Sequence, residues 1–419
     1  MPDGTLIQAP ISCCDDEPGL LPVVEARARL LRGATPVPEE EALPLAAALG
    51  RVLATVPRSG RSLPPFDQSA MDGYALHAAD LVPGAAPRIL RRIAAGDPPG
   101  PAIGPGEAVR VLTGAPVPPG AAAVVMEEHV VLRGGTVAPR RLPRPGANIR
   151  RLGEDLAAGD VLLPPGTRLD ARHLALLAAA GVGHVPVRRR VRVALLSNGN
   201  ELGAAIQDSN RPMLAALLAR PELALTDLGV LPDDPAALTA ALGEAARTHD
   251  LILASGGVSG SDADHLPGAL HRAGGEVEVL KLAQKPGKPL AHGRLGSARC
   301  LFLPGNPLAA LVGFLTLGRP LLARLSGSAE ETGPAPLAAL AARGFLRRPG
   351  REEFLPARLV GQDAASGLPL VEPSGAFGSA RLVLLAAADG PLWEPAATEQ
   401  VRPGDALRFH PFAASFGLA

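Results

Sequence analysis

The segment 188–330 alternates short apolar runs with amphipathic runs, and this alternation constrains the fold more than any other feature. The strand-like runs are "VRVALL", "LALTDLGV", "LILA", "EVEVLKL" and "RCLFL", and helix-like runs lie between most of them. Ser209 stands at the predicted N-cap of one helix, and Pro235 lies in the first turn of the next. Such alternation is typical of a three-layer α/β domain, in which helices cover both faces of a mostly parallel sheet.

The flanking segments have a different pattern. In residues 58–141, Pro and Gly divide short apolar runs about every eight to twelve residues, which predicts an inserted β-rich domain. Residues 18–57 and 142–187 form a predicted N-terminal helix and linker domain, with helices at "LPVVEARARLLRG" and "PLAAALGRVLA" and a helix capped by Asp170. Residues 331–419 contain "EEFLPARLV", "LPLVEP", "ARLVLLAAA" and "GDALRFH", which predict strands of a small C-terminal β-barrel. The expected protein is therefore multidomain, α/β plus β.

Composition excludes several classes of protein. Lys+Arg and Asp+Glu number 41 each, so the formal net charge is zero and nothing favours nucleic acid or a membrane surface as partner. Three cysteines cannot form a disulfide framework, and no basic stretch followed by an apolar stretch marks a secretory signal. We therefore expect a cytoplasmic protein, with Cys13 and Cys14 in an N-terminal tail.

Polar loops follow the predicted strands of the α/β segment. In an open α/β sheet, ligands bind outside the carboxyl ends of the strands, so these loops are expected at one edge. They are "SNGNEL", "LPDD", "SGGVSGSDAD", "KLAQKPGKP" and "LPGNP". Gly256 and Gly257 allow close approach of the backbone to an anion, and Lys281, Lys285 and Lys288 add positive charge.

Carboxylates in the same loops predict a cation beside that anion. They are supplied by Glu201, Asp233, Asp234, Asp262 and Asp264. Carboxylates of this kind suit Mg²⁺ that bridges them to phosphate oxygens. The sequence therefore predicts a phosphate-bearing ligand that is held partly through a divalent cation.

Simpler interpretations of these loops stay open. "GVSGS" is one residue short of the G-x-S-x-G nucleophile elbow, so Ser259 and His265 are candidates for a hydrolase site. Asp233 and Asp234 are also suitable caps for the helix that begins at Pro235. The chain has no G-x-x-x-x-G-K-[ST] loop, and its nine histidines show no zinc-binding spacing.

Seven motifs occur in order along nearly the whole chain. The first is "PPFDQSAMDGYAL" at 64–76, and the others are "VLTGAPVPPGAAAVVMEE", "GANIRRLGEDLAAGDVLLPPGTRL", "DSNRPML", "LASGGVSGSDAD", "KLAQKPGKPLAHG" and "LFLPGNPLAALVGF". In sequence and order these motifs resemble the molybdopterin molybdenumtransferase (MoeA/gephyrin) family of molybdenum cofactor biosynthesis. The first is the most specific, since the family has a nearly identical segment with Asn in place of Gln68.

The resemblance implies a fold, a reaction and partners. It implies an L-shaped, four-part subunit in a homodimer, where the N-terminal β segment of one subunit helps to close the molybdopterin cleft of the other. The implied reaction inserts molybdate into adenylylated molybdopterin with Mg²⁺ and releases AMP. Implied partners are molybdopterin adenylyltransferase and the molybdoenzyme clients.

The resemblance also implies the residues of the site. Glu201 and Asp264 would hold the metal or orient water, and Lys281 and Lys285 would bind phosphate or molybdate. Asp67 and Asp155 would act from the β side of the cleft. Asp233 completes the implied catalytic set, and the implied cofactor-binding set is Ser197, Asn200, Ser209, Asn210, Ser255, Gly256, Gly257, Val258, Ser259, Lys288, Pro304, Gly305, Asn306 and Pro307.

Two departures from the family pattern fall inside this site. The family's S-T-G-D-E-L is here "SNGNEL", so Asn200 replaces a carboxylate with an amide that carries no charge for a metal. The family's G-V-S-V-G-E-A-D is here "GVSGSDAD". They motivate an alternative, a non-catalytic relative that binds molybdopterin or organises other enzymes. A nucleotide pyrophosphatase or deamidase that shares only the α/β domain is a third interpretation, which "FDQSAMDGYAL" disfavours.

Overall fold

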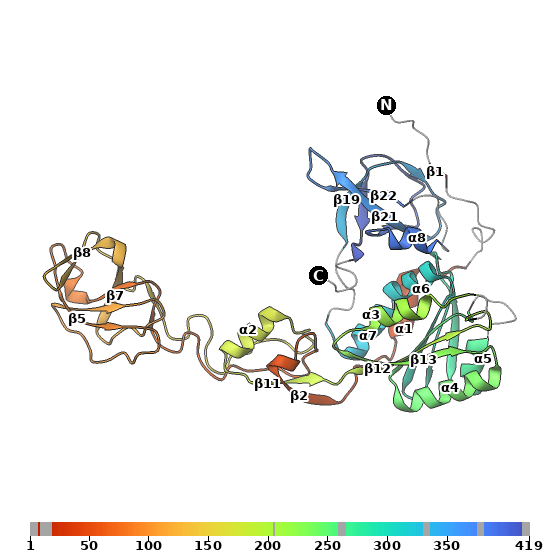
Figure 1. Cartoon of the computed structure of the whole chain (residues 1–419), viewed down its shortest axis with the longest axis horizontal. Helices are drawn as coiled ribbons and strands as arrows, with labels where there is room; N and C mark the ends of the chain where they lie inside the picture. The colour runs from red at the N-terminus through yellow and green to blue at the C-terminus, as the bar shows by residue number, and fades with distance from the viewer. Residues whose placement is uncertain are drawn as a thin grey trace.

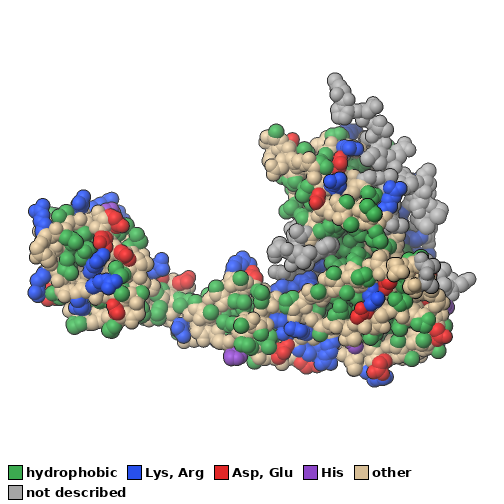
Figure 2. All heavy atoms as spheres, viewed as in Figure 1, with side chains coloured by type: hydrophobic (Ala, Val, Ile, Leu, Met, Phe, Trp, Pro, Cys, Tyr) green, Lys and Arg blue, Asp and Glu red, His purple; other side chains and the backbone are tan. Residues whose placement is uncertain are grey.

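The computed structural model describes residues 7–8, 19–203, 206–258, 265–329, 336–374 and 381–412 (Figure 1). The α/β domain lies at one end of the molecule with the C-terminal barrel above it, and the inserted β domain lies at the far end of a long arm. Acidic and basic side chains are interspersed on the face seen in Figure 2, in keeping with the balanced charge of the chain.

A six-stranded sheet forms the centre of the α/β domain. Its order is β13 (Leu223–Leu231), β12 (Val191–Asn198), β14 (Leu251–Ser255), β18 (Ala298–Leu303), β17 (Pro289–Leu295) and β15 (Glu276–Lys281). Strands β12, β13, β14 and β18 pair in parallel, whereas β17 is antiparallel to both of its neighbours. The predicted mostly parallel sheet is confirmed. Strand β17 was not predicted, because Pro289, Gly293 and Arg294 interrupt its apolar pattern.

Helices cover both faces of this sheet, which confirms the three layers. One face packs against α1 (Val23–Leu31), α3 (Asn210–Leu218) and the stretch formed by α6 (Pro307–Gly313), a π-helical turn (Phe314–Gly318) and α7 (Arg319–Ser326). The other face packs against α4 (Pro235–Thr248) and α5 (His265–Arg272).

The stretch Pro307–Ser326 is the one described helix that is long and apolar enough to cross a membrane. Of its most apolar window, 83% is buried inside the protein, as expected for a core helix.

The C-terminal region forms a closed barrel, as predicted. Among the described residues, β21 (Glu352–Gln362), β22 (Pro369–Pro373), β19 (Leu337–Ala341), β25 (Ala406–Phe409) and β23 (Gly390–Glu394) pair in a ring. A small sheet of β1 (Ile7–Gln8), β20 (Phe345–Leu346) and β24 (Gln400–Val401) adjoins it. The predicted strand at "ARLVLLAAA" is wrong: helix α8 (Leu382–Ala386) forms there, because its run of Leu and Ala lacks the alternation of a strand and favours a helix.

The arm begins with β2 (Glu40–Pro44), which pairs with β11 (His184–Arg188). The helix predicted at "PLAAALGRVLA" is wrong, since only a 3-10 turn (Leu45–Ala47) forms. Gly50 has φ +74°, and Val52 and Leu53 then bridge to other segments, so long-range pairing overrides local helical spacing. Helix α2 (Ala171–Ala179) forms as predicted, with Asp170 and His173 in a capping box.

The inserted β domain lies beyond a two-stranded ribbon of β3 (Gln68–Ser69) and β10 (Ile149–Arg150). Its sheet has the order β7 (Ala121–Met126), β4 (Gly73–His77), β6 (Glu107–Val111), β5 (Arg88–Ile93), β9 (Thr136–Pro139) and β8 (Val130–Arg133). Apolar clusters cover both faces, and 3-10 turns lie at Ala78–Asp80 and Glu127–His129.

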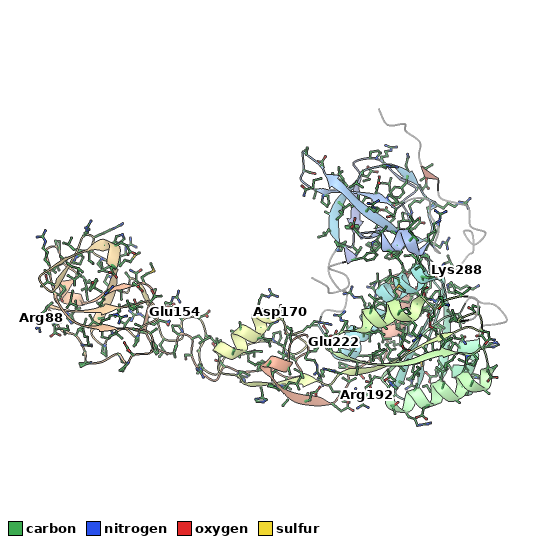
Figure 3. All side chains as sticks on the ribbon, in the orientation of Figure 1. Arg88, Glu154, Asp170, Arg192, Glu222 and Lys288 are labelled. Carbon is green, nitrogen blue, oxygen red and sulfur yellow. The ribbon has the colours of Figure 1, made fainter. Side chains whose placement is uncertain are left out.

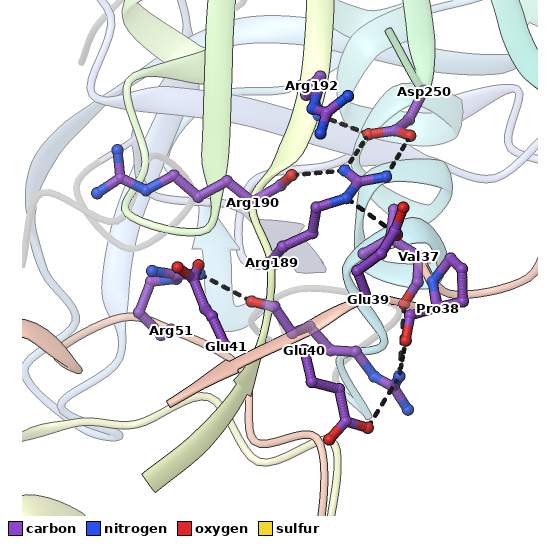
Figure 4. A network of polar contacts seen from close by, with 11 residues as sticks. Val37, Pro38, Glu39, Glu40, Glu41, Arg51, Arg189, Arg190, Arg192 and Asp250 are labelled. Atoms are coloured by element: carbon purple, nitrogen blue, oxygen red, sulfur yellow. Dashed lines mark hydrogen bonds and ion pairs between the residues drawn. The ribbon is translucent and has the colours of Figure 1, made fainter. Parts of the chain in front are cut away.

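An ionic junction fastens the arm to the α/β domain (Figure 4). Arg189 donates two hydrogen bonds to the Asp250 carboxylate at 2.7 and 2.9 Å and a third to Glu39 at 3.0 Å. The backbone N–H of Arg192 also donates to Asp250 at 2.7 Å. Burial of Asp250 acts to raise its pKa, but the hydrogen bonds from Arg189 and Arg192 outweigh burial and lower that pKa below its ordinary value.

Candidate functional site

The carboxyl ends of five strands meet at one edge of the α/β sheet. Strands β12, β13, β14 and β18 run in the same direction, and β15 shares it because β15 and β18 are both antiparallel to β17. The loops that begin at Gly199, Pro232, Gly256, Leu282 and Pro304 therefore line this one edge. The structure thus brings together the described residues that the sequence assigned to this edge.

Buried polar groups form the floor of the edge. Ser197 and Ser255 lie opposite each other on β12 and β14, and their hydroxyl oxygens are 3.2 Å apart. Asn198 is 2% exposed, its amide group faces the carbonyl of Leu231 at 3.4 Å, and its Oδ1 has no hydrogen-bond partner among the described residues. Asn198 was missing from the predicted set. Its only signal in the sequence is its place at the end of a buried strand.

The two glycines after β14 are required by close contacts with Asn198. A Cβ on Gly256 would lie 2.3 Å from the Asn198 carbonyl oxygen, and a Cβ on Gly257 would lie 2.5 Å from Asn198 Oδ1. Their φ angles of +93° and +64° also favour glycine. The next residue, Val258, is 2% exposed and packs in the core behind the sheet, so its side chain contributes no polar group to the edge.

Asn200 and Asp233 connect the first two loops. The Asn200 N–H donates to Asp233 Oδ2 at 2.9 Å, and the Asp233 N–H donates to Asn200 Oδ1 at 3.0 Å. Asp234 accepts a hydrogen bond from Ala237 N–H at 2.6 Å and caps α4, so the simpler interpretation of Asp234 is confirmed. These two hydrogen bonds show the role of the Asn200 side chain. Its amide oxygen accepts from the Asp233 N–H, and because the amide is neutral it adds no second negative charge beside the Asp233 carboxylate.

The fifth loop lies close to the third loop and to α3. A Cβ on Gly305 would lie 3.7 Å from Gly256 Cα, and Asn210, the first residue of α3, donates through its amide to the Gly305 carbonyl at 2.8 Å. Asn306 caps α6, with Pro307 at its first position and Pro304 buried before it. The predicted capping role of Ser209 is wrong: its side chain makes no capping bond, and Asp208 instead accepts from Arg211 N–H at 3.1 Å, because Asp208 lies three residues before that donor.

The three predicted lysines lie on the fourth loop. Lys281 is exposed at the end of β15, and Lys285 and Lys288 are half-buried (Figure 3 labels Lys288). The Lys285 ammonium lies 3.0 Å from Oε1 of Glu353, a buried residue of the barrel strand β21. Sequence reasoning missed Glu353, because the two residues are distant in the chain and no local pattern pairs them.

The predicted metal ligands are Glu201 and Asp264. Asp264 lies outside the described residues, as do Ser259 and Asp262 of the same loop. Glu201 is exposed at this edge, and its carboxylate lies over Gly199, whose Cβ would be 2.6 Å from Glu201 Oε1. Within the described ranges no group of three His, Cys, Asp or Glu residues is arranged for a metal. Glu201 has the oxygen-donor chemistry that Mg²⁺ prefers, so the described half of the predicted ligand pair fits that ion.

Asp67 and Asp155 belong to the arm. Asp67 directly precedes β3, and Asp155 follows Glu154, which Figure 3 labels in the arm, away from Lys288 of the α/β edge. Asp67 accepts hydrogen bonds from Leu152 N–H at 2.8 Å and from Arg151 Nη1 at 2.6 Å. These bonds, that from Leu152 above all, lower its pKa and keep it ionised. Asp155 lines an open pocket of about 690 Å³ with Leu63, Pro64, Pro65, Gln68, Arg150 and Glu154.

The fold and this lysine-bearing edge define a class: a multidomain α/β protein whose polar loops collect where open α/β sheets bind their ligands. Family models identify it further. MoeA N-terminal region (domain I and II) matches residues 21–181, a probable molybdopterin binding domain matches 194–324, and MoeA C-terminal region (domain IV) matches 338–412. The chain belongs to the MoeA family of molybdopterin molybdenumtransferases, and the resemblance found in its motifs is confirmed.

Relatives in this family span nearly the whole chain. Molybdopterin molybdenumtransferase of Haemophilus influenzae is 38% identical over 80% of this chain and 85% of its own length. Molybdopterin molybdenumtransferase 2 of Mycobacterium tuberculosis is 37% identical over 91% of this chain and 96% of its own. The crystal structure of molybdopterin biosynthesis moeA protein from Pyrococcus horikoshii has a TM-score of 0.79 at 28% identity, covering 93% of this chain and 99% of that one.

Proposed function

We propose that the chain is a molybdenum insertase, which transfers molybdate onto the dithiolene of adenylylated molybdopterin with release of AMP. The observation that carries this proposal is the edge of the α/β sheet, which is lined by five polar loops, one of which supplies Lys281, Lys285 and Lys288. A pyrophosphate-bridged substrate and an oxyanion are both anionic, and clustered lysines and loop N–H groups are suited to bind them. Membership of the molybdopterin molybdenumtransferase family supports this reaction.

Each residue has a proposed task in this reaction. Lys281 and Lys285 bind phosphate or molybdate oxygens, and the Asn200–Asp233 pair holds the first two loops at a fixed spacing. Glu201 and Asp264 are the residues that would hold Mg²⁺ or orient water. When bound, Mg²⁺ supplies the positive charge that allows carboxylates to lie beside phosphate oxygens.

We also propose that the working site is shared between two copies of the chain. The arm that carries Asp67 and Asp155 extends away from the α/β domain of its own chain (Figure 1), so we infer that these acids serve another copy. A second copy, related by a two-fold axis, would present these acids to the edge and complete both sites at once. The proposed setting is the cytoplasm, with molybdopterin adenylyltransferase upstream and molybdoenzyme clients downstream.

The test is release of AMP from adenylylated molybdopterin, measured with and without molybdate and Mg²⁺. We expect release that depends on both ions, and a loss of about a hundredfold in Lys281→Ala, because that variant removes a charge from the binding edge. Arg272→Ala, on the outer helix α5, is the control and should match the wild type. Substrate binding without release of AMP would contradict the proposal.

Asn200 motivates a second candidate, a binding protein without turnover. An aspartate at this position could accept the same Asp233 N–H, so Asn200→Asp tests the charge alone. Because the amide already fills the acceptor position, we expect the wild type to turn over and Asn200→Asp to change its rate by less than about threefold. If the wild type released no AMP and Asn200→Asp did, the binding-protein interpretation would be established.

A further inference from the structure

The loop that carries Lys285 is built into the C-terminal barrel. Strand β16 (Gln284–Lys285) pairs in parallel with β21, with Lys285 opposite Glu353. The Glu352 N–H donates to the Ala283 carbonyl at 2.8 Å, and the Ala283 N–H donates to the Leu21 carbonyl at 2.8 Å. The backbone before Lys285 is therefore fixed from two sides by segments that are distant in sequence.

The side chain of Gln284 adds to this anchoring. Gln284 is fully buried, accepts a hydrogen bond from Thr316 Oγ1 at 3.1 Å and donates one to the Pro286 carbonyl at 3.1 Å. Thr316 belongs to the central helical stretch, so the lysine loop is tied to the core of the α/β domain as well as to the barrel.

The Glu353 carboxylate is itself immobilised. It is 3% exposed, with one oxygen 3.0 Å from Lys285 Nζ and the other accepting from Arg347 Nε at 3.2 Å. Arg347 is also buried, and its remaining donors bind backbone carbonyls of the barrel, those of Pro395, Thr398 and Arg351. Since all three guanidinium nitrogens of Arg347 donate hydrogen bonds, Glu353 has a fixed position from which to orient Lys285.

We propose that Glu353 of the barrel is a positioning residue for the anion site of the α/β edge, and that it acts through Lys285. The inference rests on the proposed function for the identity of the substrate. An ammonium has three N–H donors. Glu353 accepts from one of them and so fixes the orientation of the Lys285 ammonium, while the other two can donate to an incoming anion. The Glu353 carboxylate also partly neutralises the positive charge of Lys285. It therefore weakens the attraction between Lys285 and a free anion, although it keeps the ammonium in a fixed orientation.

Glu353→Gln separates these two effects. Gln keeps the size of the side chain but removes the negative charge. Lys285 then attracts anions more strongly, and the orientation of its ammonium is less well fixed. We expect the affinity for free molybdate to rise by about threefold to tenfold, and kcat to fall by about tenfold. General damage to the fold would weaken both binding and turnover, so opposite signs identify positioning.

The experiment measures binding of molybdate, with inorganic phosphate as a second probe, by titration calorimetry on the full chain. Glu352→Gln is the matched control, because Glu352 is the adjacent residue of β21 and binds Trp393 Nε1 at 2.7 Å. Glu352→Gln removes the same negative charge as Glu353→Gln, and we expect its affinity for molybdate to match that of the wild type. In a Lys285→Gln background, Glu353→Gln should have no further effect on affinity. Equal changes in the two glutamate variants, or an effect that persists without Lys285, would overturn the proposal.

Two additions keep the outcome decisive. If Glu353→Gln does not fold, Glu353→Asp retains the charge on a shorter arm, and we expect a lower kcat with unchanged anion affinity; unchanged kcat would overturn the inference. Calorimetric binding needs no turnover. A chain that binds molybdate as predicted but releases no AMP would contradict the proposed function, while the effect of Glu353 on anion affinity through Lys285 would still be established.

Discussion

The α/β edge and the arm pocket hold the two halves of the predicted site, and they are built differently. At the edge, Ser197, Asn198 and Ser255 are buried, and Gly256 and Gly257 pack so closely against Asn198 that neither has space for a Cβ. In the arm, Glu154 and Asp155 are exposed around an open pocket. The described part of the edge is thus buried and closely packed within one chain, whereas the arm presents acids outward, as expected of a surface that serves another molecule.

The largest expected difference between the regions comes from adding one carbon to a glycine. Gly256→Ala places Cβ 2.3 Å from a carbonyl oxygen at φ +93°, and we expect a loss of about 3–4 kcal/mol in free energy of unfolding. Gly153→Ala in the arm has φ +71° but only ordinary contacts from 3.6 Å, so about 1 kcal/mol is expected. Urea denaturation measures both, and equal losses would remove the contrast in packing.

The junction between the regions gives the next largest effect. Asp250→Asn removes the charge that binds Arg189, and we expect a loss of about 2 kcal/mol at neutral pH because both side chains are mostly buried. Glu276→Gln, which loosens the exposed pair with Arg294, is the control and should cost less than about 0.5 kcal/mol.

The pH dependence of the junction follows from the lowered pKa of Asp250. A carboxylate with a depressed folded-state pKa stabilises the protein above its unfolded pKa of about 4, and this stabilisation is lost as pH falls through the folded value. The difference between wild type and Asp250→Asn should therefore be constant above about pH 5 and shrink below about pH 4. Melting temperatures across this range check it, and a difference that grows in acid would contradict the assignment.

The smallest effect on stability is expected for the acids of the arm. Asp67→Asn should change the free energy of unfolding by less than about 1 kcal/mol, because the carboxylate is partly exposed and Asn retains an acceptor for Leu152 N–H. Its effect on AMP release should be larger, about tenfold. An inactive protein with a large loss of stability would instead make Asp67 a structural residue.

Sequence reasoning succeeded where one local pattern determines the outcome. The parallel strands, the glycines after β14 and the cap at Asp170 all follow from periodicity or spacing within a few residues. It failed where distant segments decide: β17 forms only against β15 and β18, and the helix expected after Pro44 gives way to pairing with other strands. The Lys285–Glu353 pair joins two domains, and no local signal could have found it.

The central claim, one site built from the α/β edge of one copy and the arm of another, is tested most directly by complementation. Lys281→Ala disables the edge and Asp67→Ala disables the arm, so each variant alone should be nearly inactive in molybdate-dependent AMP release. When the two chains are co-expressed, half of the dimers carry one intact site of two, and about a quarter of wild-type activity should return. Activity no greater than the sum of the separate variants would show that each chain works with its own residues, and would contradict the account.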